Sequence, residues 1–209
     1  MGAGDTGSGP GRPVVTLFEL YGAGAAPIGR AVADALGLPF HEQAFSSEAL
    51  QQGAEDDLAE SATLARVLST LGGAYGGFEG RDVVATQQEK YDLVMANNRE
   101  VWAYADEGGV IVGRNAPVIL AERPRTVHVL LTGEQGDRVR RAAQEAGITP
   151  EEAARRQQRE DTVRVQMSQV LYGWDPSRPE RYDMVLNTSR IPADAAVAAI
   201  VDATRALDR

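Results

Sequence analysis

The chain of 209 residues carries a formal net charge of −9 at pH 7, and its length suits one domain, or one domain with an inserted lid. An acidic chain lacks the basic face that neutralises nucleic-acid phosphates, so we expect no nucleic-acid partner. The absence of cysteine excludes disulfides, thiolate metal sites and a cysteine nucleophile. No apolar run approaches the roughly 18 residues of a membrane-spanning helix, so we expect a cytoplasmic protein without a membrane partner.

Residues 1–12 are rich in glycine and polar, without the apolar centre of a secretory signal, and we expect them to form a disordered tail. The next segment, Val14–Phe18, is the nearly continuous apolar run of a strand that is buried on both faces. A glycine-rich turn follows at Tyr21–Gly29. A helix is predicted over Ile28–Leu36, with Pro27 near its first turn.

The turn after the first strand has the outline of a phosphate-binding loop. The backbone N–H groups of such a turn converge on one spot, and the helix N-terminus adds partial positive charge there. The pattern G-x-x-x-x-G-K-[ST] needs a lysine for the outer phosphates and a hydroxyl for magnesium. Gly24 and Gly29 have the right spacing, but Arg30 stands at the lysine position and Ala31 at the hydroxyl position. The alternative is a plain strand-to-helix turn whose glycines serve only backbone geometry.

The rest of the chain alternates between extended and helical segments. Extended segments are predicted at Leu38–Phe40, Val110–Val112, Thr126–Leu131 and Met184–Leu186. Helices are predicted at 47–52 and 58–71, from an Asp82 cap to about Ala105, at Glu134–Ala146, from a Thr149 cap to about Leu171, and at Asp194–Leu207, with a glycine loop at Gly72–Gly77. The helix that ends near Ala105 carries an apolar stripe of Val84, Tyr91, Val94, Met95, Val101, Trp102 and Ala105.

Alternating strands and helices favour an α/β fold with a parallel sheet. Right-handed crossovers place the loops after the strands along one edge of such a sheet, where ligands bind. The loops concerned are 21–29, 113–115, 132–136 and 187–190.

Three segments, in this order, together identify a family. They are Tyr21-Gly-Ala-Gly with Ile28-Gly29, Val110-Ile-Val-Gly-Arg-Asn-Ala116, and Tyr182-Asp-Met-Val-Leu-Asn-Thr-Ser189. They resemble the cytidylate-kinase-like family, a branch of the P-loop nucleoside monophosphate kinases. The resemblance implies a single domain over 13–209 with a three-layer P-loop kinase fold and about five parallel strands. A helical insert over about 41–106 would bind the acceptor, and a lid over about 149–173 would close on the phosphates.

The resemblance also implies an activity and its cofactors. Cytidylate kinases move the outer phosphate of ATP to CMP or dCMP with magnesium, so ATP and Mg²⁺ are expected here. The donor phosphates would contact Gly22, Ala23, Gly24, Ala25, Ile28, Gly29 and Arg30. Arg138 would lie near the donor base, although a solvated surface position explains this arginine equally well. His41 and His128 are far apart in the chain and indicate no metal site.

The loop departs from the family pattern at several positions. Where the family usually has S-R-E-Y-G-S-G-G-R-E-I, this chain has Phe18-Glu-Leu-Tyr-Gly-Ala-Gly-Ala-Ala-Pro-Ile28. Glu19 and Ala26 stand at the two arginine positions, and Pro27 removes a backbone N–H. Phosphoryl transfer relies on positioning and positive charge, and one lost clamp of this type costs about 3 kcal/mol.

Arg114 and Asn115 follow the strand Val110–Val112 and are predicted to bind the acceptor. Arginine offers a planar fork that matches phosphate, and asparagine can pair with a base edge or a ribose. The resemblance assigns this position to the acceptor nucleotide. The alternative is an arginine that bridges to an acidic surface loop.

Arg159, Asp161 and Arg164 lie closest to the family's lid pattern and are the predicted catalytic residues, because kinase lids use arginines to neutralise the charge of the transferring group. Arg156, Glu160 and Arg164 also fall at i, i+4 spacing, so a set of solvated ion pairs is the alternative.

The leading hypothesis is therefore a phosphotransferase that acts on a nucleoside monophosphate or another small phosphorylated acceptor. The alternatives are a catalytically degenerate homologue that serves as a nucleotide-binding regulatory or structural partner, and a kinase adapted to a non-nucleotide acceptor. A homodimer through Tyr172–Trp174 is a further possibility.

Overall fold

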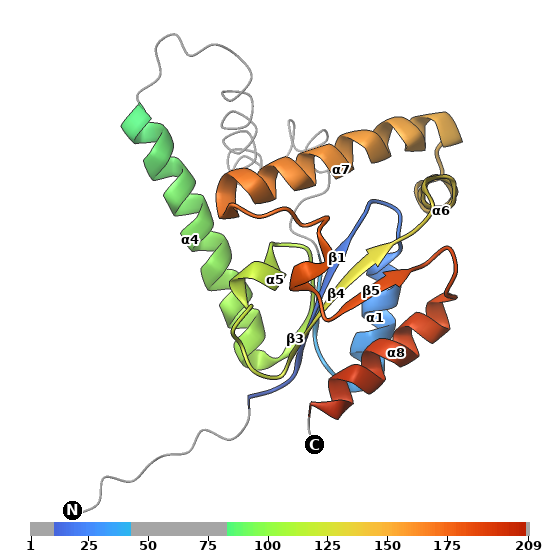
Figure 1. The fold of residues 1–209 in the computed structure, drawn as a ribbon, viewed down its shortest axis with the longest axis horizontal. Coiled ribbons are helices and arrows are strands. Elements are labelled where there is room, and N and C mark those ends of the chain that lie inside the picture. Colours follow the sequence, from blue (N-terminus) through green and yellow to red (C-terminus); the bar gives the residue numbers. More distant parts are fainter. Residues whose placement is uncertain (1–10, 43–82, 208–209) are drawn as a thin grey trace, which may run out of the picture.

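The structure, a computed structural model, describes residues 11–42 and 83–207, and a five-stranded parallel sheet lies at its centre (Figure 1). The strand order is β2-β3-β1-β4-β5, and each neighbouring pair is parallel. The strands are β1 (Val14–Glu19), β2 (Phe40–His41), β3 (Gly109–Val112), β4 (Thr126–Thr132) and β5 (Met184–Asn187). The predicted parallel sheet is therefore confirmed.

Helices cover both faces of the sheet and complete a three-layer arrangement (Figure 1). One face carries α1 (Ala25–Leu36) and α8 (Ala193–Ala206), and the other carries α4 (Val83–Glu107) and α5 (Ala116–Ile119). The two remaining helices, α6 (Gln135–Ala146) and α7 (Pro150–Tyr172), pack against each other, and a 3₁₀ turn, η1, spans Pro179–Arg181.

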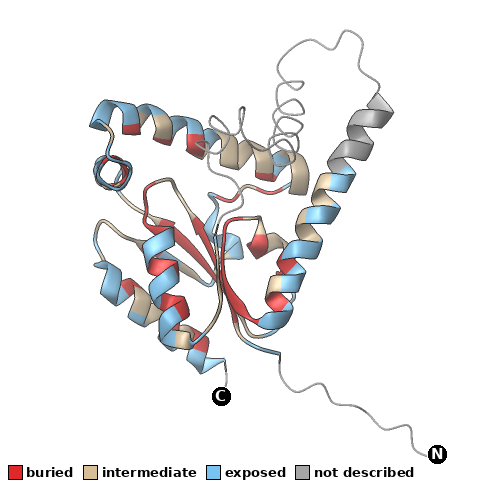
Figure 2. Ribbon diagram, turned by 180° about the vertical axis from the view of Figure 1, so that it is seen from behind, coloured by how far each residue is buried: buried red, intermediate tan, exposed pale blue. Residues whose placement is uncertain are grey.

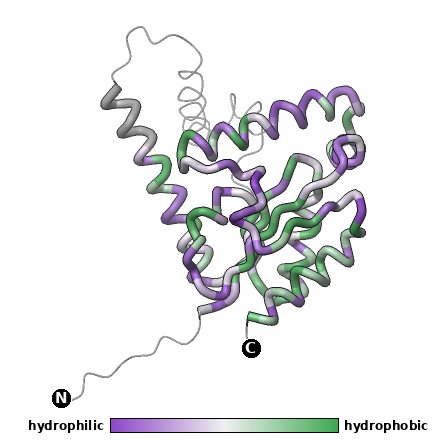
Figure 3. The backbone as a smooth tube through the Cα atoms, viewed as in Figure 1, coloured by the Kyte–Doolittle hydropathy of each residue, from purple (hydrophilic) through white to green (hydrophobic). Residues whose placement is uncertain are grey.

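The core forms because the strands bury side chains on both faces, and many residues of the strands are coloured as buried in Figure 2. Val15 and Leu17 of β1 belong to the cluster beneath α1 and α8. Val14 points to the opposite face and packs with Ile111 of β3 and Val101 of α4. This alternation follows from the period of two in a strand. Hydropathy follows the same division, since the strands and α8 are largely apolar whereas much of α7 is polar (Figure 3).

The loops that follow β1, β3, β4 and β5 lie at one edge of the sheet because all strands run in the same direction. α7 lies across this edge (Figure 1), and its side chains contact the loop after β1. The predicted gathering of these loops along one edge of the sheet is therefore confirmed.

Helix α1 begins at Ala25, earlier than the predicted start at Ile28. Gly24 is its N-cap, and Pro27 lies in the first turn, where a missing N–H costs no helical hydrogen bond. Gly29 is therefore an interior helix residue rather than a loop residue. A Cβ at Gly29 would lie 2.7 Å from the Phe40 ring and 3.0 Å from Leu17, so glycine permits close packing of α1 on the sheet.

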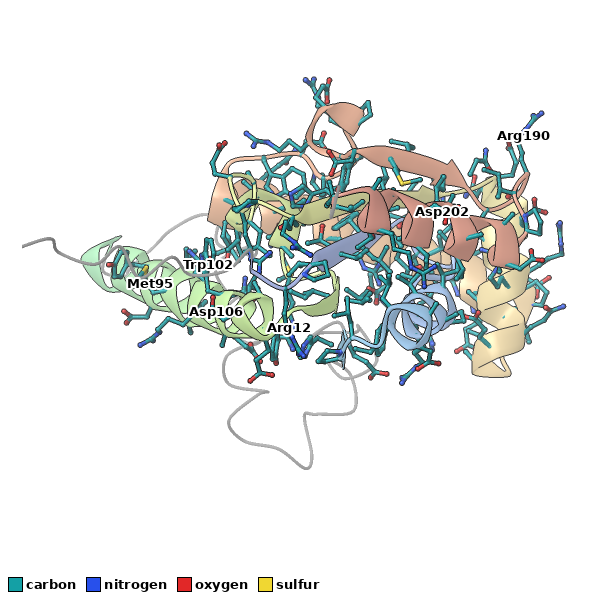
Figure 4. All side chains as sticks on the ribbon, turned by 90° about the horizontal axis from the view of Figure 1, so that it is seen from below. Arg12, Met95, Trp102, Asp106, Arg190 and Asp202 are labelled. Carbon is teal, nitrogen blue, oxygen red and sulfur yellow. The ribbon has the colours of Figure 1, made fainter. Side chains whose placement is uncertain are left out.

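The apolar stripe predicted along α4 is only partly buried. Val101 and Ala105 are buried under the sheet, whereas Tyr91, Met95 and Trp102 are exposed; Met95 and Trp102 lie along α4 in Figure 4. Trp102, although part of the predicted apolar stripe, therefore does not belong to the core of the described residues.

The predicted helices at 47–52 and 58–71, the glycine loop at 72–77, the Asp82 cap and most of the predicted tail lie outside the described residues. Within the described ranges, no helix combines the length and the apolar character that membrane crossing requires.

Candidate functional site

The loop after β1 is shaped by two glycines with positive φ. Gly22 has φ +80° and Gly24 has φ +92°, a region that costs other residues about 1–2 kcal/mol. A Cβ at Gly22 would lie only 2.4 Å from the carbonyl oxygen of Arg138, so the loop and α6 approach as closely as backbone allows. The two glycines turn the N–H groups at the start of α1 back toward the end of β1.

These N–H groups hold a side chain of the protein itself. The Oε2 atom of Glu19 accepts hydrogen bonds from the N–H of Gly24 at 3.0 Å and of Ala25 at 2.9 Å. The Ala23 and Ile28 N–H groups donate to backbone carbonyls, and Pro27 has no N–H. Most of the donors that would make this loop an anion site are therefore already used.

Helix α7 holds the loop from above through a polar stripe. Asp161 Oδ1 accepts the N–H of Tyr21 at 2.7 Å, and Arg164 Nη1 donates to the carbonyl of Glu19 at 3.2 Å. Arg164 Nη1 also lies 3.6 Å from Glu19 Oε1, and Arg164 Nε lies 3.5 Å from Glu160 Oε2. Glu160 is only 4% exposed. The predicted alternative of solvated pairs is therefore wrong for Glu160 and Arg164, because both face the protein interior.

Arg138 ties α6 to the loop and to α7. Its guanidinium donates to the carbonyls of Gly133 and Tyr21, each at 3.0 Å, and pairs with Asp161 Oδ2 at 3.0 Å. When the amide oxygen of the buried Gln157 faces the guanidinium, it accepts hydrogen bonds from Nη1 and Nη2 of Arg138, each at 3.0 Å. Arg138 is 7% exposed, so the alternative of a solvated surface arginine is wrong.

A polar cavity lies beside the loop, between α6 and the turn after β5. Its volume is about 370 Å³, and its lining residues are Asp137, Arg140, Arg141, Gln144, Thr188 and Ser189. Arg141 connects it to the loop, donating to the Gly22 carbonyl at 2.6 Å and to Thr188 Oγ1 at 3.1 Å. Cavities of this size hold small ligands.

The turn after β3 presents Arg114 and Asn115 in an unusual backbone conformation. Both have positive φ, +59° and +56°, which is uncommon outside glycine and persists only where the surroundings enforce it. Trp174 Nε1 donates to Asn115 Oδ1 at 2.9 Å. The Arg114 guanidinium pairs with Glu100 and lies 5.3 Å from the Tyr104 ring centre. The Glu100 carboxylate, which also accepts the Tyr104 hydroxyl, raises the pKa of Tyr104.

The structure does not bring every predicted residue to this edge. Arg30 lies on α1, where it pairs with Glu42 and stacks on Phe40. Arg159 is exposed and stands about 140° around α7 from Arg164, as five residues of an α-helix require. Ala23, Gly24 and Ala25 are buried in the loop itself, and Ile28 packs into the core below it.

The sequence profile of the cytidylate kinase-like family matches residues 14–190. The chain belongs to this family. A cytidylate kinase of Methanopyrus kandleri is 27% identical over 190 residues, which cover 87% of each protein. A uronate isomerase of Corynebacterium glutamicum is 30% identical over 152 residues, which cover 72% of this chain and 29% of that protein. The chain thus spans less than a third of that relative.

Solved structures agree on the fold. A protein of Eubacterium ventriosum, described as uncharacterized, superposes with a TM-score of 0.64 at 16% identity, covering 93% of this chain and 99% of that one. A gluconokinase of Sinorhizobium meliloti superposes with a TM-score of 0.52 at 16% identity, covering 95% and 93%. The predicted resemblance and the P-loop kinase fold are confirmed, and family membership supports a kinase-like phosphotransferase.

The family implies a nucleotide and a metal, but the loop as it stands does not fit a magnesium triphosphate. Glu19 occupies two of the loop N–H groups, and Ala31 supplies no hydroxyl at the position where the loop pattern has serine or threonine. Within the described residues, no group of three or more His, Cys, Asp or Glu could hold a metal ion. Burial and the nearby charge of Glu19 raise the pKa of Glu145.

Sequence reasoning missed the residues that support the Arg114 turn. Asn97 Nδ2 donates to the Arg114 carbonyl at 2.8 Å and to the Tyr172 hydroxyl at 2.7 Å, and Tyr172 donates to Asn98 Oδ1 at 3.0 Å. Trp174, which is buried, packs edge-on against Phe18. The sequence signal for these residues was the presence of two amides, Asn97 and Asn98, within the predicted apolar stripe of α4.

Proposed function

We propose that this chain is a phosphotransferase of the kinase class that acts on a small phosphorylated acceptor, such as a CMP-like nucleoside monophosphate. The observation that carries the proposal is the turn at Arg114 and Asn115. Two successive non-glycine residues in the left-handed region store strain that proteins retain mainly at functional sites. The turn lies at the edge of the sheet where the loops after the strands gather, and it carries an arginine and an amide.

Arg114 is suited to an acceptor phosphate because its present partner can leave. The Arg114 side chain is 11% exposed, whereas that of Glu100 is 45% exposed. An exposed carboxylate on a helix can rotate into solvent, and the fork of the guanidinium then fits phosphate oxygens. Asn115 would contact the acceptor with the amide nitrogen that its bond to Trp174 leaves available.

The cavity between α6 and the turn after β5 supports a nucleotide at the other side of the loop. Arg141 links the cavity wall to Gly22, so a ligand there would approach the loop. Family membership implies ATP and Mg²⁺, and a magnesium triphosphate would fit the loop only after Glu19 leaves the Gly24 and Ala25 N–H groups. A cytoplasmic location and a homodimer stay predictions.

The test is an ADP-release assay over a panel of acceptors. The panel contains CMP, dCMP and the other nucleoside monophosphates, together with gluconate and uronates, chosen because a gluconokinase shares the fold and a uronate isomerase is a relative. Gluconate and uronates carry no phosphate, so turnover with them alone would contradict a phosphorylated acceptor. With the accepted substrate, Arg114→Ala should raise KM about ten- to a hundredfold, because a charge-assisted hydrogen bond contributes about 1.5–3 kcal/mol. The exposed Arg178→Ala removes the same charge elsewhere and should leave KM unchanged. Unchanged kinetics in Arg114→Ala would refute the acceptor assignment.

One observation favours a second candidate, a catalytically degenerate homologue that acts as a regulatory or structural partner. Glu19 fills the loop with a negative charge where the family has an arginine. Turnover in the ADP-release assay separates the two candidates, and thermal melting with and without each nucleotide shows whether the chain binds one, because a ligand at a hundred times its Kd adds about 2.7 kcal/mol. No shift with any nucleotide and no turnover with any acceptor would support the degenerate homologue.

A further inference from the structure

The loop after β1 carries a charged contact that the proposed phosphoryl transfer does not use. Glu19 is the last residue of β1, and its side chain folds back onto the N–H groups of Gly24 and Ala25 at the start of α1. We propose that the Glu19 carboxylate is an internal ligand of the phosphate loop. The carboxylate occupies the place of a phosphate group and must leave before a phosphate or pyrophosphate group binds. This inference deepens the proposed function and depends on it for the kind of ligand.

The contact has the chemistry of anion binding. Two N–H groups at 3.0 and 2.9 Å and the N-terminus of a 12-residue helix face one carboxylate oxygen. Helix N-termini favour an anion at this place, and phosphates use the same groups. A phosphate cannot share these two N–H groups with Glu19, because two anions at contact distance repel each other. Binding is therefore a competition between an internal and an external anion.

The surroundings of Arg164 give a second, independent observation. Its Nη1 atom donates to the Glu19 carbonyl, but its buried Nε atom makes no hydrogen bond, and its ion pairs with the Glu160 and Glu19 carboxylates are 3.5 and 3.6 Å long, beyond normal hydrogen-bond distance. Such a guanidinium keeps unused donor capacity. Glu19 is therefore held mainly by the loop, and Arg164 has donors for the oxygens of an anion that replaces it.

Inorganic pyrophosphate is the appropriate probe, because it contains neither an acceptor nor a base. The full chain is titrated with pyrophosphate by calorimetry in the wild type, Glu19→Ala, Glu19→Gln and the control Asp34→Ala. Asp34 is an exposed carboxylate on α1, so its variant changes the net charge equally without touching the loop. We expect Glu19→Ala to bind pyrophosphate roughly ten- to a hundredfold more tightly than the wild type and Asp34→Ala.

Amide NMR locates the binding. In Glu19→Ala, the Gly24 and Ala25 amide signals should move on addition of pyrophosphate, and the additional change Arg164→Ala should lose most of the gained affinity. Glu19→Gln, which keeps the side-chain shape, provides the same comparison if the alanine variant unfolds. Equal pyrophosphate affinity in the wild type and both Glu19 variants would overturn the inference, as would binding that leaves the two amides unmoved. Tighter binding in the variants together with no acceptor phosphorylation would leave the inference standing and remove the proposed function.

Discussion

Replacing Arg138 by alanine tests how strongly the buried ionic contact holds α6, α7 and the loop together. The variant removes the partner of Asp161 and leaves the carbonyls of Tyr21 and Gly133 without this donor. Breaking a buried pair costs about 3–5 kcal/mol. The Asp161 side chain is 27% exposed, so water can replace part of the lost contact, and the lower end, about 3 kcal/mol, is the expected loss. For a chain of this length that loss lowers Tm by about 6–12 °C.

The assay is urea unfolding followed by fluorescence, with thermal melting as a second measure. Arg140→Ala is the matched control, because Arg140 lies on the same helix with a side chain that is 67% exposed, and it should change stability by less than about 0.5 kcal/mol. Arg138→Lys keeps the charge but lacks the fork, so it should fall between the two. A loss below about 1 kcal/mol in Arg138→Ala would refute the view that this contact determines the position of α7.

Three further predictions follow from the same contacts. Gly22→Ala should lower the free energy of unfolding in urea by at least about 2 kcal/mol, because it combines a φ of +80° with a Cβ contact of 2.4 Å to backbone. Gly37→Ala is the control with a smaller expected loss, because a Cβ at Gly37 meets no atom within 4 Å. Burial lowers the pKa of His128 in the folded state, so below about pH 6.5 the unfolded state binds more protons at this residue than the folded state does. The free energy of unfolding should therefore fall on acidification, with His128 contributing at most about 1.4 kcal/mol per pH unit. If His128→Asn had the same pH profile of stability as the wild type, this prediction would be contradicted. Asn97→Ala should cost about 1–3 kcal/mol by leaving the Arg114 carbonyl and the Tyr172 hydroxyl without their shared donor, and Asn97→Asp, which cannot donate, should reproduce the loss in thermal melting.

The fold could be predicted because its signals are local. The Val- and Ile-rich runs at β1 and β3 are typical of parallel strands, and the Thr149 cap, whose side chain accepts the Glu152 N–H at 3.2 Å, indicates the start of α7. The predicted start of α1 at Ile28 is too late, because the phosphate-loop pattern G-x-x-x-x-G-K-[ST] extends the loop from Gly24 to Gly29. The observed helix starts at Ala25, where Pro27 is compatible with a first turn.

The site could be predicted only as a set of residues, because its contacts join segments far apart in the chain. The sequence indicated that Glu19 adds negative charge near the loop, but its bond to Gly24 depends on the backbone angles of two glycines. The burial of Arg138 depends on α7, whose Asp161 lies 23 residues later in the chain. No local pattern reports such a contact.

The anion-binding groups at this edge share one physical property, an internal acidic partner. Glu19 binds the loop, Asp161 pairs with Arg138, and Glu100 pairs with Arg114. A phosphorylated ligand therefore gains only the difference between its own contacts and those it displaces. Because α7 carries Asp161 and Arg164, both of which contact the loop, displacement of Glu19 also removes one of the contacts that hold α7 there. Loop binding and the position of α7 are thus coupled, because an anion that replaces the Glu19 carboxylate would also take its place beside Arg164 of α7.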